Sequence, residues 1–312
     1  MRAVAILGPN ARASDLAPFR RADLGVSLTQ AFSPEPDADA VLILGGDGTI
    51  HRHLAKLVET GTPVLPIPGG SANDFARALG MHQRGDAVVA WQEFCRGAGN
   101  TRKVDVGVIT PLEVVAPVPS PAGPVSSADV PTVNQKLGTR NSTFFCNIGG
   151  AGLDANANRR VNTWPRWVRA HGGYAVAALR EIATWKPVRI TVRLQSENGE
   201  WCKRIDEPAT FAVFANTPAY GDGMKMAPRA LLDDGLLDLC FVRRTSRRRI
   251  LTFFPTVYFG SHLRLPEVEY FQAPAIRLET DRPMDVYADG EYVCRTPVQV
   301  GVLPSALRVI VP

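Results

Sequence analysis

The chain begins with short apolar runs that alternate with stretches of helical spacing. Residues 3–8 (AVAILG) and 40–46 (AVLILGG) are almost continuously apolar, as strands buried on both faces are. After the second run, apolar residues recur at helical spacing from Ile50 to Val58, and Gly61 marks the end of the predicted helix. These patterns predict two buried strands, the second leading directly into a helix.

The same order of strand, turn and helix is repeated in residues 63–79. PVLPIPGG (63–70) predicts a strand that ends in glycine, and SANDFARAL (71–79) predicts the start of a helix. Repetition of this unit is typical of a parallel α/β sheet. We therefore expect a nucleotide-binding α/β domain formed by residues 1–103, completed by a returning C-terminal strand at about 304–312.

Beyond residue 103 the pattern changes to strand-sized segments separated by turn signals. These segments are VRITVRL, FAVFAN, LLDLCFV, IRLET, DVYADG and VQVGVL. They predict an antiparallel β-sandwich-like domain over residues 104–303. One helical stretch is expected at about 165–183. The proline-rich residues 111–140 predict a long flexible insertion between two strands.

Composition restricts the class of protein. The chain has 312 residues and is 45% apolar, enough to bury a full core. Its five cysteines are widely spread and include no C-x-x-C pair, which argues against a disulfide framework or a zinc site and fits a reducing cytosol. The first residues predict a strand rather than a signal peptide, and no apolar run is long enough to cross a bilayer. We expect a soluble, cytoplasmic protein.

A formal net charge of +5 suits an anionic partner, but it does not choose between nucleotides, nucleic acid and an acidic membrane surface. The basic residues gather in two clusters, although each could simply be a solvated face. The tighter cluster is Arg243, Arg244, Arg247, Arg248 and Arg249, and the looser one is Arg159, Arg160, Arg166 and Arg169.

Two glycine-rich turns carry the first chemical signal. GGDGT (45–49) and GGSANDF (69–75) both lie between a predicted strand and a predicted helix. Such turns point backbone N–H groups at phosphates, and the helix N-terminus adds partial positive charge. Asp47 would repel phosphates unless a divalent cation lay between them, so it is a candidate to hold Mg²⁺ directly or through water. The alternative is an ordinary turn, which two turns at one sheet edge make less favourable.

The order of motifs resembles the diacylglycerol kinase catalytic-domain family, which includes bacterial lipid kinases and sphingosine kinases. GGDGT is followed by P-x-G-[ST]-x-N-D-F-A-R, and later segments match in order along nearly the whole chain. These segments are KVDVG (103–107), NIGGAGLDA (147–155), GDGMKMAPRALLDDGLLDL (221–239) and DGE (289–291). NAD kinases and phosphofructokinases share only the first element.

The resemblance implies ATP and Mg²⁺ as cofactors and assigns residues to them. The ATP phosphates would be bound by Gly45, Gly46, Asp47, Gly48 and Thr49 of the first loop, with Gly70, Ser71 and Asn73 of the second. Thr29 is a further candidate contact of the nucleotide. Asp74 and Asp105 would join a network of carboxylates, water and metal. The ALLDDGLL turn, which contains Asp233, would hold Mg²⁺ through the Asp234 carboxylate and the carbonyls of Leu231 and Leu236; without the resemblance this turn could be a tight hairpin.

The DGE segment raises the question of the general base. A lipid hydroxyl loses its proton as it attacks the γ-phosphate, so a carboxylate must lie within hydrogen-bond reach. In an extended segment, Asp289 and Glu291 project to the same face. We favour Glu291 as the base, with Asp289 positioning metal or water, although D-G-E alone is a common hairpin turn.

Two departures from the family pattern stand out. The family often continues GGDGT-x-N-E, whereas His51 and Arg52 occupy the last two positions here. Both could contact phosphate, or both could point into solvent. In addition, only about ten residues (FSPEPDADAV) separate the expected second strand from VLILGG, which predicts that a helix of the family is missing.

The sequence as a whole predicts an ATP-dependent kinase that phosphorylates a lipid alcohol and contacts an anionic membrane peripherally, with no nucleic-acid partner. Two alternatives are a kinase of a soluble substrate such as NAD, and a non-catalytic nucleotide- or lipid-binding relative. Diacylglycerol, a sphingoid base and ceramide are all possible acceptors, because the acyl pocket would be built from generic apolar residues.

Overall fold

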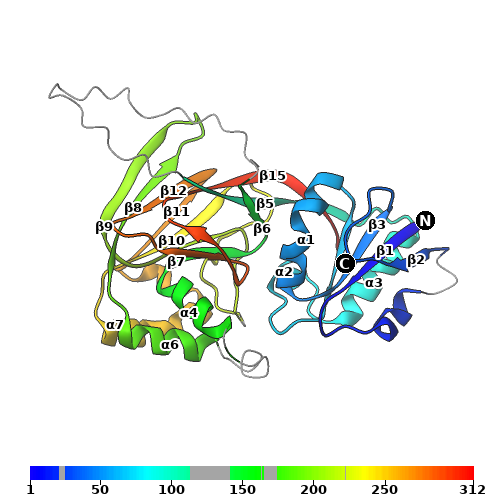
Figure 1. Cartoon of the computed structure of the whole chain (residues 1–312), viewed down its shortest axis with the longest axis horizontal. Helices are drawn as coiled ribbons and strands as arrows, with labels where there is room; N and C mark the ends of the chain where they lie inside the picture. Colours follow the sequence, from blue (N-terminus) through cyan, green and yellow to red (C-terminus); the bar gives the residue numbers. More distant parts are fainter. Residues whose placement is uncertain (21–24, 113–140, 163, 165–173, 222) are drawn as a thin grey trace.

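The structure is a computed structural model that describes residues 1–20, 25–112, 141–162, 164, 174–221 and 223–312. Most of the insertion predicted at 111–140 and the first half of the helix predicted at 165–183 lie outside these residues. In Figure 1 a smaller half with both chain termini lies beside a larger half that is rich in strands.

The smaller half contains the predicted parallel α/β sheet. Its strands follow the order β4-β3-β1-β2, and every neighbouring pair is parallel. The strands are β1 (Arg2–Leu7), β2 (Ser27–Gln30), β3 (Ala40–Gly45) and β4 (Val64–Pro68). The helical elements are the 3₁₀ helix η1 (Ala13–Phe19) and the helices α1 (Asp47–Thr60), α2 (Asp74–Ala78) and α3 (Arg84–Cys95). The predicted strand–turn–helix repeats are confirmed.

Helix α1 forms because its apolar stripe faces the sheet. Ile50, Leu54 and Leu57 are buried, whereas Arg52 is exposed on the opposite side. Gly61 ends the helix in the left-handed conformation (φ 64°) and donates its N–H to the Leu57 carbonyl. Residues 31–39 contain no helix, as the short connection before β3 predicts.

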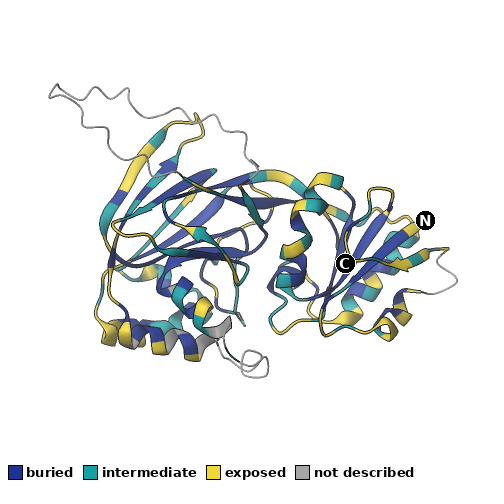
Figure 2. Ribbon diagram, in the orientation of Figure 1, coloured by how far each residue is buried: buried dark blue, intermediate teal, exposed yellow. Residues whose placement is uncertain are grey.

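The larger half consists of antiparallel strands, which confirms the prediction of an antiparallel β-sandwich-like fold in this part of the chain. Its strands are β5 (Thr101–Pro111), β6 (Thr143–Phe145), β7 (Ile148–Gly152), β8 (Val188–Gln195), β9 (Trp201–Ala215), β10 (Leu237–Arg243), β11 (Val268–Ala273), β12 (Ala275–Thr280), β13 (Asp285–Ala288), β14 (Glu291–Arg295) and β15 (Val298–Ile310). They follow the order β14-β13-β7-β9-β8-β12-β15, with β10 and β11 branching from β9, and β5 and β6 from β15. Figure 2 shows their inner faces buried.

Helices cover one end of these strands to a greater extent than the sequence predicts. Helices α4 (Leu153–Asn162), α6 (Tyr174–Thr184) and α7 (Arg247–Phe253) lie together, and the 3₁₀ helices η4 (Phe254–Phe259) and η5 (Ser261–Arg264) follow α7 (Figure 1). Only α6 falls within the predicted helix. Helix α4, with the sequence LDANANRRVN, escapes detection because Asn and Asp are weak helix formers and its apolar residues are few.

Strands β5 and β15 join the two halves. Strand β15 pairs with β12 near its start, and near its end Val309 pairs with Val64 of β4. Its pairing with β5 shifts between Leu303 and Leu307, where Ser305 adopts a positive φ of 55°. The division into domains of residues 1–103 with 304–312, and 104–303, stays a prediction. Among the described residues, no helix is both long and apolar enough to cross a bilayer.

Close packing at Gly107 positions the strands that lead to the site. A Cβ atom at Gly107 would lie 2.1 Å from two ring carbons of Phe145, which is fully buried. The Phe145 ring packs edge-to-face on Phe214, with 5.4 Å between ring centroids. Strand β6 can therefore approach β5 only because residue 107 has no side chain.

We expect Gly107→Ala to lower the free energy of unfolding by about 1–3 kcal/mol, because the new methyl group overlaps a ring that has no room to move. Urea denaturation measures this change. Gly85→Ala is the matched control: a Cβ there lies 4.0 Å from its nearest neighbour, in helix α3, so it should be neutral or stabilising. Equal effects of the two substitutions would contradict this packing.

Candidate functional site

The two glycine-rich turns lie against each other at one edge of the parallel sheet. The N–H of Gly69 donates to the Gly45 carbonyl at 3.0 Å. A Cβ on Gly70 would lie 2.5 Å from the Cα of Gly46, so neither turn could pack this way with a side chain at residue 70. The predicted phosphate loops therefore form one continuous backbone surface beside the N-termini of α1 and α2.

Asn73 fixes the second loop. It adopts the left-handed conformation (φ 55°), and its Oδ1 accepts from the N–H groups of Gly69 and Gly70 at 3.1 and 2.7 Å. Ser71 is exposed beside it. Asn73 thus shapes the loop through the backbone, which leaves Ser71 as the side chain of this loop that is open to a ligand.

Asp47 joins the first loop to the second. It is the first residue of α1, and its two carboxylate oxygens accept from the N–H groups of Asp74 and Phe75, both at 3.0 Å. The carboxylate therefore sits at the positive end of α2. Burial raises the pKa of Asp47, these two N–H groups oppose that rise, and the charge of Asp289 adds to it.

Asp289 occupies the turn between β13 and β14. Asp289 and Gly290 have φ values of 51° and 82°, so they are the two central residues of a tight hairpin turn. The prediction that Asp289 and Glu291 share one face of an extended segment is wrong, because an Asp-Gly pair favours a turn with two positive φ angles. The Asp289 side chain is fully buried and accepts from the backbone N–H groups of Cys146 and Asn147 at 3.0 and 2.8 Å.

Asn147 connects Asp47 and Asp289. Its backbone N–H donates to Asp289 Oδ1, and its side-chain Nδ2 donates to Asp47 Oδ1 at 3.2 Å. The other amide atom, Oδ1, is buried and accepts no hydrogen bond within the described part of the chain. Asn216, also fully buried, supports this segment by bonding the Asn147 carbonyl and the Asp105 carbonyl.

His51 belongs to this cluster and not to the solvent. It lies one helical turn after Asp47, and its Nδ1 is 3.1 Å from Asp289 Oδ2, with 13% of the side chain exposed. Burial lowers the pKa of His51, but the hydrogen bond and charge of Asp289 raise it, with a net rise above the ordinary 6.5. Arg52 remains exposed. Of the two outcomes considered for His51 from the sequence, solvent exposure does not match its position, and phosphate contact stays a prediction.

Glu291 differs from Asp289 in its environment. It is exposed at the start of β14, and its Oε1 lies 3.2 Å from the position that a Cβ on Gly48 would occupy. The described residues donate no hydrogen bond to its carboxylate. Glu291 therefore stands beside the first turn of α1 with both oxygens available, whereas the oxygens of Asp289 are already bonded.

The predicted acidic residues divide between two places. Near Asp47, Asp74 is buried and accepts from the N–H of Gly221 at 2.8 Å. At the second place, the buried Asp105 carboxylate accepts from Gly235 and Ser305, both at 2.7 Å. Asp105 thus connects the ALLDDGLL turn (residues 230–237, the acidic turn) to the bend in β15.

Within the acidic turn, Asp233 and Asp234 point to different partners. Asp233 pairs with Arg102 at 2.7 Å, whereas one Asp234 oxygen accepts from the N–H of Leu236 at 3.0 Å. Burial raises the pKa of Asp234, and the charges of Asp105 and Asp233 add to that rise. Leu231 is exposed on this turn. In the part of the chain that is described, no three His, Cys, Asp or Glu side chains converge on one point.

Thr29 lies apart from the loops. It is exposed on β2, the edge strand, and is separated from β3 by β1, a spacing of about 10 Å. Thr49, by contrast, is buried beneath the first loop, and a Cβ on Gly45 would lie 2.5 Å from its hydroxyl. The roles predicted for all of these residues stay predictions.

Sequence reasoning did not predict the residues that contact Asp289, which are His51, Cys146 and Asn147. Asn147 opens the NIGGAGLDA segment, so its motif was visible, but no local pattern pairs it with residue 47 or 289. His51 was noticed only as a departure from the family.

We expect the stability of the chain to depend on pH through His51. Its pKa is higher in the folded than in the unfolded state, so its contribution is present below pH 6.5 and is lost as the pH rises through the folded pKa. In urea denaturation, the free energy of unfolding of wild type should therefore fall relative to that of His51→Asn between about pH 6 and about pH 8. The exposed His82→Asn is the control, and identical pH dependence in all three proteins would contradict the His51–Asp289 contact.

Comparison with known proteins places this geometry in a family. Residues 8–109 match the diacylglycerol kinase catalytic domain, and residues 148–311 match the YegS C-terminal NAD kinase beta sandwich-like domain. A protein named diacylglycerol kinase from Mycobacterium tuberculosis is 29% identical over 274 residues, covering 88% of this chain and 77% of the relative. One of the same name from Bacillus subtilis is 22% identical over 276 residues, covering 88% and 78%.

A solved structure shares the fold. The crystal structure of a diacylglycerol kinase from Bacillus anthracis superposes with a TM-score of 0.64 at 16% identity, covering all of this chain and 97% of the other. The two family matches lie in the expected order and together span both halves of the fold, and the second alone covers more than half of the chain. The chain therefore belongs to the diacylglycerol kinase catalytic-domain family of lipid kinases, whose members use ATP.

Proposed function

We propose that the chain transfers the γ-phosphoryl group of ATP to the hydroxyl group of a lipid alcohol at the surface of a membrane. The observation that carries this proposal is the junction at Asn147. Asn147 brings the Asp47 loop and the Asp289–Glu291 turn together. The Glu291 carboxylate, which accepts no hydrogen bond from the described residues, therefore lies beside the loop that would bind the phosphates.

The nucleotide phosphates would lie on the paired loops. Backbone N–H groups of residues 46–48 and 71, together with the positive end of α1, favour negative charge there, whereas those of Gly69, Gly70 and Thr49 are bonded within the loops. The exposed Ser71 hydroxyl adds a donor from the second loop. Thr29, on the sheet edge, would contact the nucleoside end if the nucleotide extends across β1.

Glu291 is the better of the two candidates for the general base. Its carboxylate is exposed and receives no hydrogen bond from the described residues, so it can accept the proton that leaves the lipid hydroxyl. Asp289 is fully buried and already bonded to two backbone N–H groups and to His51. We assign Asp289 to holding the β13–β14 turn, and so to positioning Glu291. Being exposed, Glu291 can return its proton to solvent after each turnover.

The residues present fit the expected Mg²⁺. Asn147 Oδ1 is a buried oxygen without a hydrogen-bond donor, next to the Asp47 carboxylate, and the turn at Leu231, Asp234 and Leu236 offers a carboxylate and two carbonyls. These are hard oxygen donors of the kind that Mg²⁺ prefers. When bound, the ion would neutralise charge that develops on the transferred phosphoryl group.

The relatives favour a lipid acceptor over a soluble one. Proteins that match most of this chain are named diacylglycerol kinase, whereas phosphate loops of this kind occur in kinases of lipids and of NAD alike. Diacylglycerol is therefore the first acceptor to test, with a sphingoid base and ceramide as competitors.

Docking to an anionic bilayer is the second part of the proposal, and a patch on α7 and η4 supports it. We define the α7 patch as Arg247, Arg248, Leu251 and Phe259. Leu251 is 47% and Phe259 80% exposed, and the described residues contain no acidic partner for the two arginines. Their neighbours differ: Arg243 pairs with Glu207 and Glu269, and Arg249 with Glu267. Only part of the basic cluster is thus available to headgroups.

We expect purified wild-type protein with Mg²⁺ and radiolabelled ATP to label diacylglycerol, and Glu291→Gln to lower kcat by on the order of 10²- to 10⁴-fold with nucleotide affinity retained. Product analysis by mass identifies the acceptor within a panel of diacylglycerol, sphingosine, ceramide and NAD. Glu197→Gln, an exposed residue in the β8–β9 turn, is the matched control and should be fully active. Label in NAD alone would refute the lipid acceptor, and equal, background-level transfer by all three proteins would refute catalysis.

We expect the Arg247→Gln/Arg248→Gln variant to bind vesicles of anionic phosphatidylglycerol about 30-fold more weakly than wild type, since each near-surface charge contributes about 1 kcal/mol. Vesicle flotation measures this, and wild-type binding should also weaken steeply with added salt. Arg243→Gln is the control, because acidic neighbours already neutralise that guanidinium. Binding that is insensitive to salt and to the double substitution would rule out this mode of docking.

A further inference from the structure

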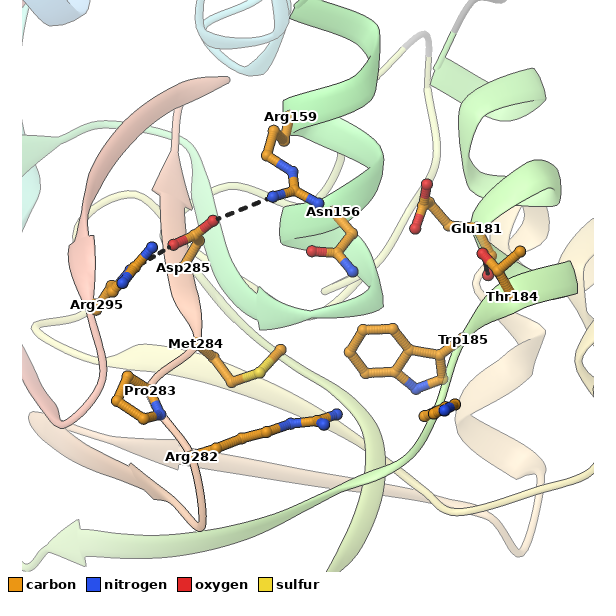
Figure 3. Close-up of a pocket in the computed structure, with 11 residues that line it drawn as sticks. Asn156, Arg159, Glu181, Thr184, Trp185, Arg282, Pro283, Met284, Asp285 and Arg295 are labelled. Carbon is orange, nitrogen blue, oxygen red and sulfur yellow. Dashed lines mark hydrogen bonds and ion pairs between the residues drawn. The ribbon is translucent and has the colours of Figure 1, made fainter.

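A cavity lies away from the phosphate loops, at the far end of the β13–β14 hairpin. It has a volume of about 400 Å³, is open to solvent on one side and is lined by α4, the C-terminal end of α6 and residues 282–285 (Figure 3). Asp285 and Arg295 pair across the open end of the hairpin, whereas Asp289 occupies its turn. Four residues of extended chain separate the two ends, about 13 Å. The cavity is therefore distinct from the site at Asp47 and Asp289.

The indole of Trp185 gives this cavity an unused hydrogen-bond donor. Trp185 is only 9% exposed, and its ring faces the cavity between Met284 and Arg282 in Figure 3. Its Nε1–H is buried and has no acceptor among the described residues. Buried donors in folded proteins are nearly always paired, so an unpaired indole N–H facing a cavity of this size indicates an acceptor that binds there.

The charge around the cavity is positive. Asp285 is shared by Arg295 and Arg159, with N–O distances of 3.0 and 3.9 Å, and the buried Glu181 is paired with Arg160. The two acidic side chains of the lining are thus already neutralised. Lys186 and Arg282 also line the cavity, and within the described chain neither has an acidic partner.

These groups together define the chemistry of a ligand. Lys186, Arg282 and the Trp185 N–H offer donors from three different side chains, which suits the several oxygens of a phosphate group. Met284 and the indole face offer apolar contact for a short carbon segment. The volume suits a small molecule or a lipid headgroup, but not two acyl chains.

We propose that this cavity binds a phosphate monoester, with the phosphate oxygens on Lys186, Arg282 and the indole N–H of Trp185. The phosphate could belong to a soluble metabolite or to the headgroup of a phosphorylated lipid. The site is separate from the proposed kinase reaction and does not depend on it.

Calorimetric titration of the full chain with glycerol 3-phosphate, with the nucleotide site saturated by ADP, tests this site directly. The variant Lys186→Gln/Arg282→Gln should bind at least ten-fold more weakly than wild type, and Trp185→Phe, which keeps the ring but removes the N–H, several-fold more weakly. Arg308→Gln, an exposed cation on β15, is the control and should bind like wild type. Thermal unfolding of each protein without ligand verifies that the variants are folded.

Flotation with phosphatidylcholine vesicles that contain phosphatidic acid separates the two sources of phosphate. Binding of glycerol 3-phosphate and of these vesicles, both reduced in the double variant, supports a site for the monoester from either source; a reduction seen only with vesicles restricts the site to lipid headgroups. If wild type and the double variant bind both probes equally, or wild type binds neither, the proposal is overturned.

Discussion

The hydrogen bonds of Asn147 are the interaction on which the rest of the site depends. Asp47 lies at the start of α1 in the parallel sheet, and Asp289 lies in a hairpin turn near the end of the chain. A single residue between β6 and β7 bonds both, one through its side chain and the other through its backbone. Together with the contact between His51 and Asp289, these hydrogen bonds fix the position of Glu291 relative to the phosphate loops.

Two buried carboxylates repel each other, and the backbone around them compensates for that repulsion. Asp47 binds the N–H groups at the start of α2, and Asp289 binds those of Cys146 and Asn147, with His51 beside it. Hydrogen bonds to a charged group contribute about 1.5–3 kcal/mol each, and they offset part of the cost of placing two carboxylates close together. His51 adds a partly buried imidazole, whose pKa is raised by Asp289, where the family pattern has an amide.

Local sequence pattern is sufficient for the strands and for the helices of the smaller half, but not for every helix of the larger half or for the contacts between elements. The helix from Asp47 to Gly61 and the strands at 40–45 and 64–68 follow from periodicity and glycine placement. Helix α4 does not, because its stability comes from packing on α6 and not from its own residues. The contact between residues 51 and 289 joins positions 238 apart in sequence, and no spacing rule reaches that far.

Asp105 belongs to a sequence motif of the family, and its hydrogen bonds stabilise the arrangement of distant strands and turns. Strands β5 and β15 run through both halves of the fold, and their pairing shifts only between Leu303 and Leu307. Asp105 bonds the N–H of Ser305 within that bend and the N–H of Gly235 in the acidic turn. One buried carboxylate thus sets both the angle at which β15 leaves the larger half and the position of the turn that offers Asp234. The acidic turn and the phosphate loops are held in place by the same kind of contact, a buried carboxylate bonded to backbone N–H groups from a distant segment.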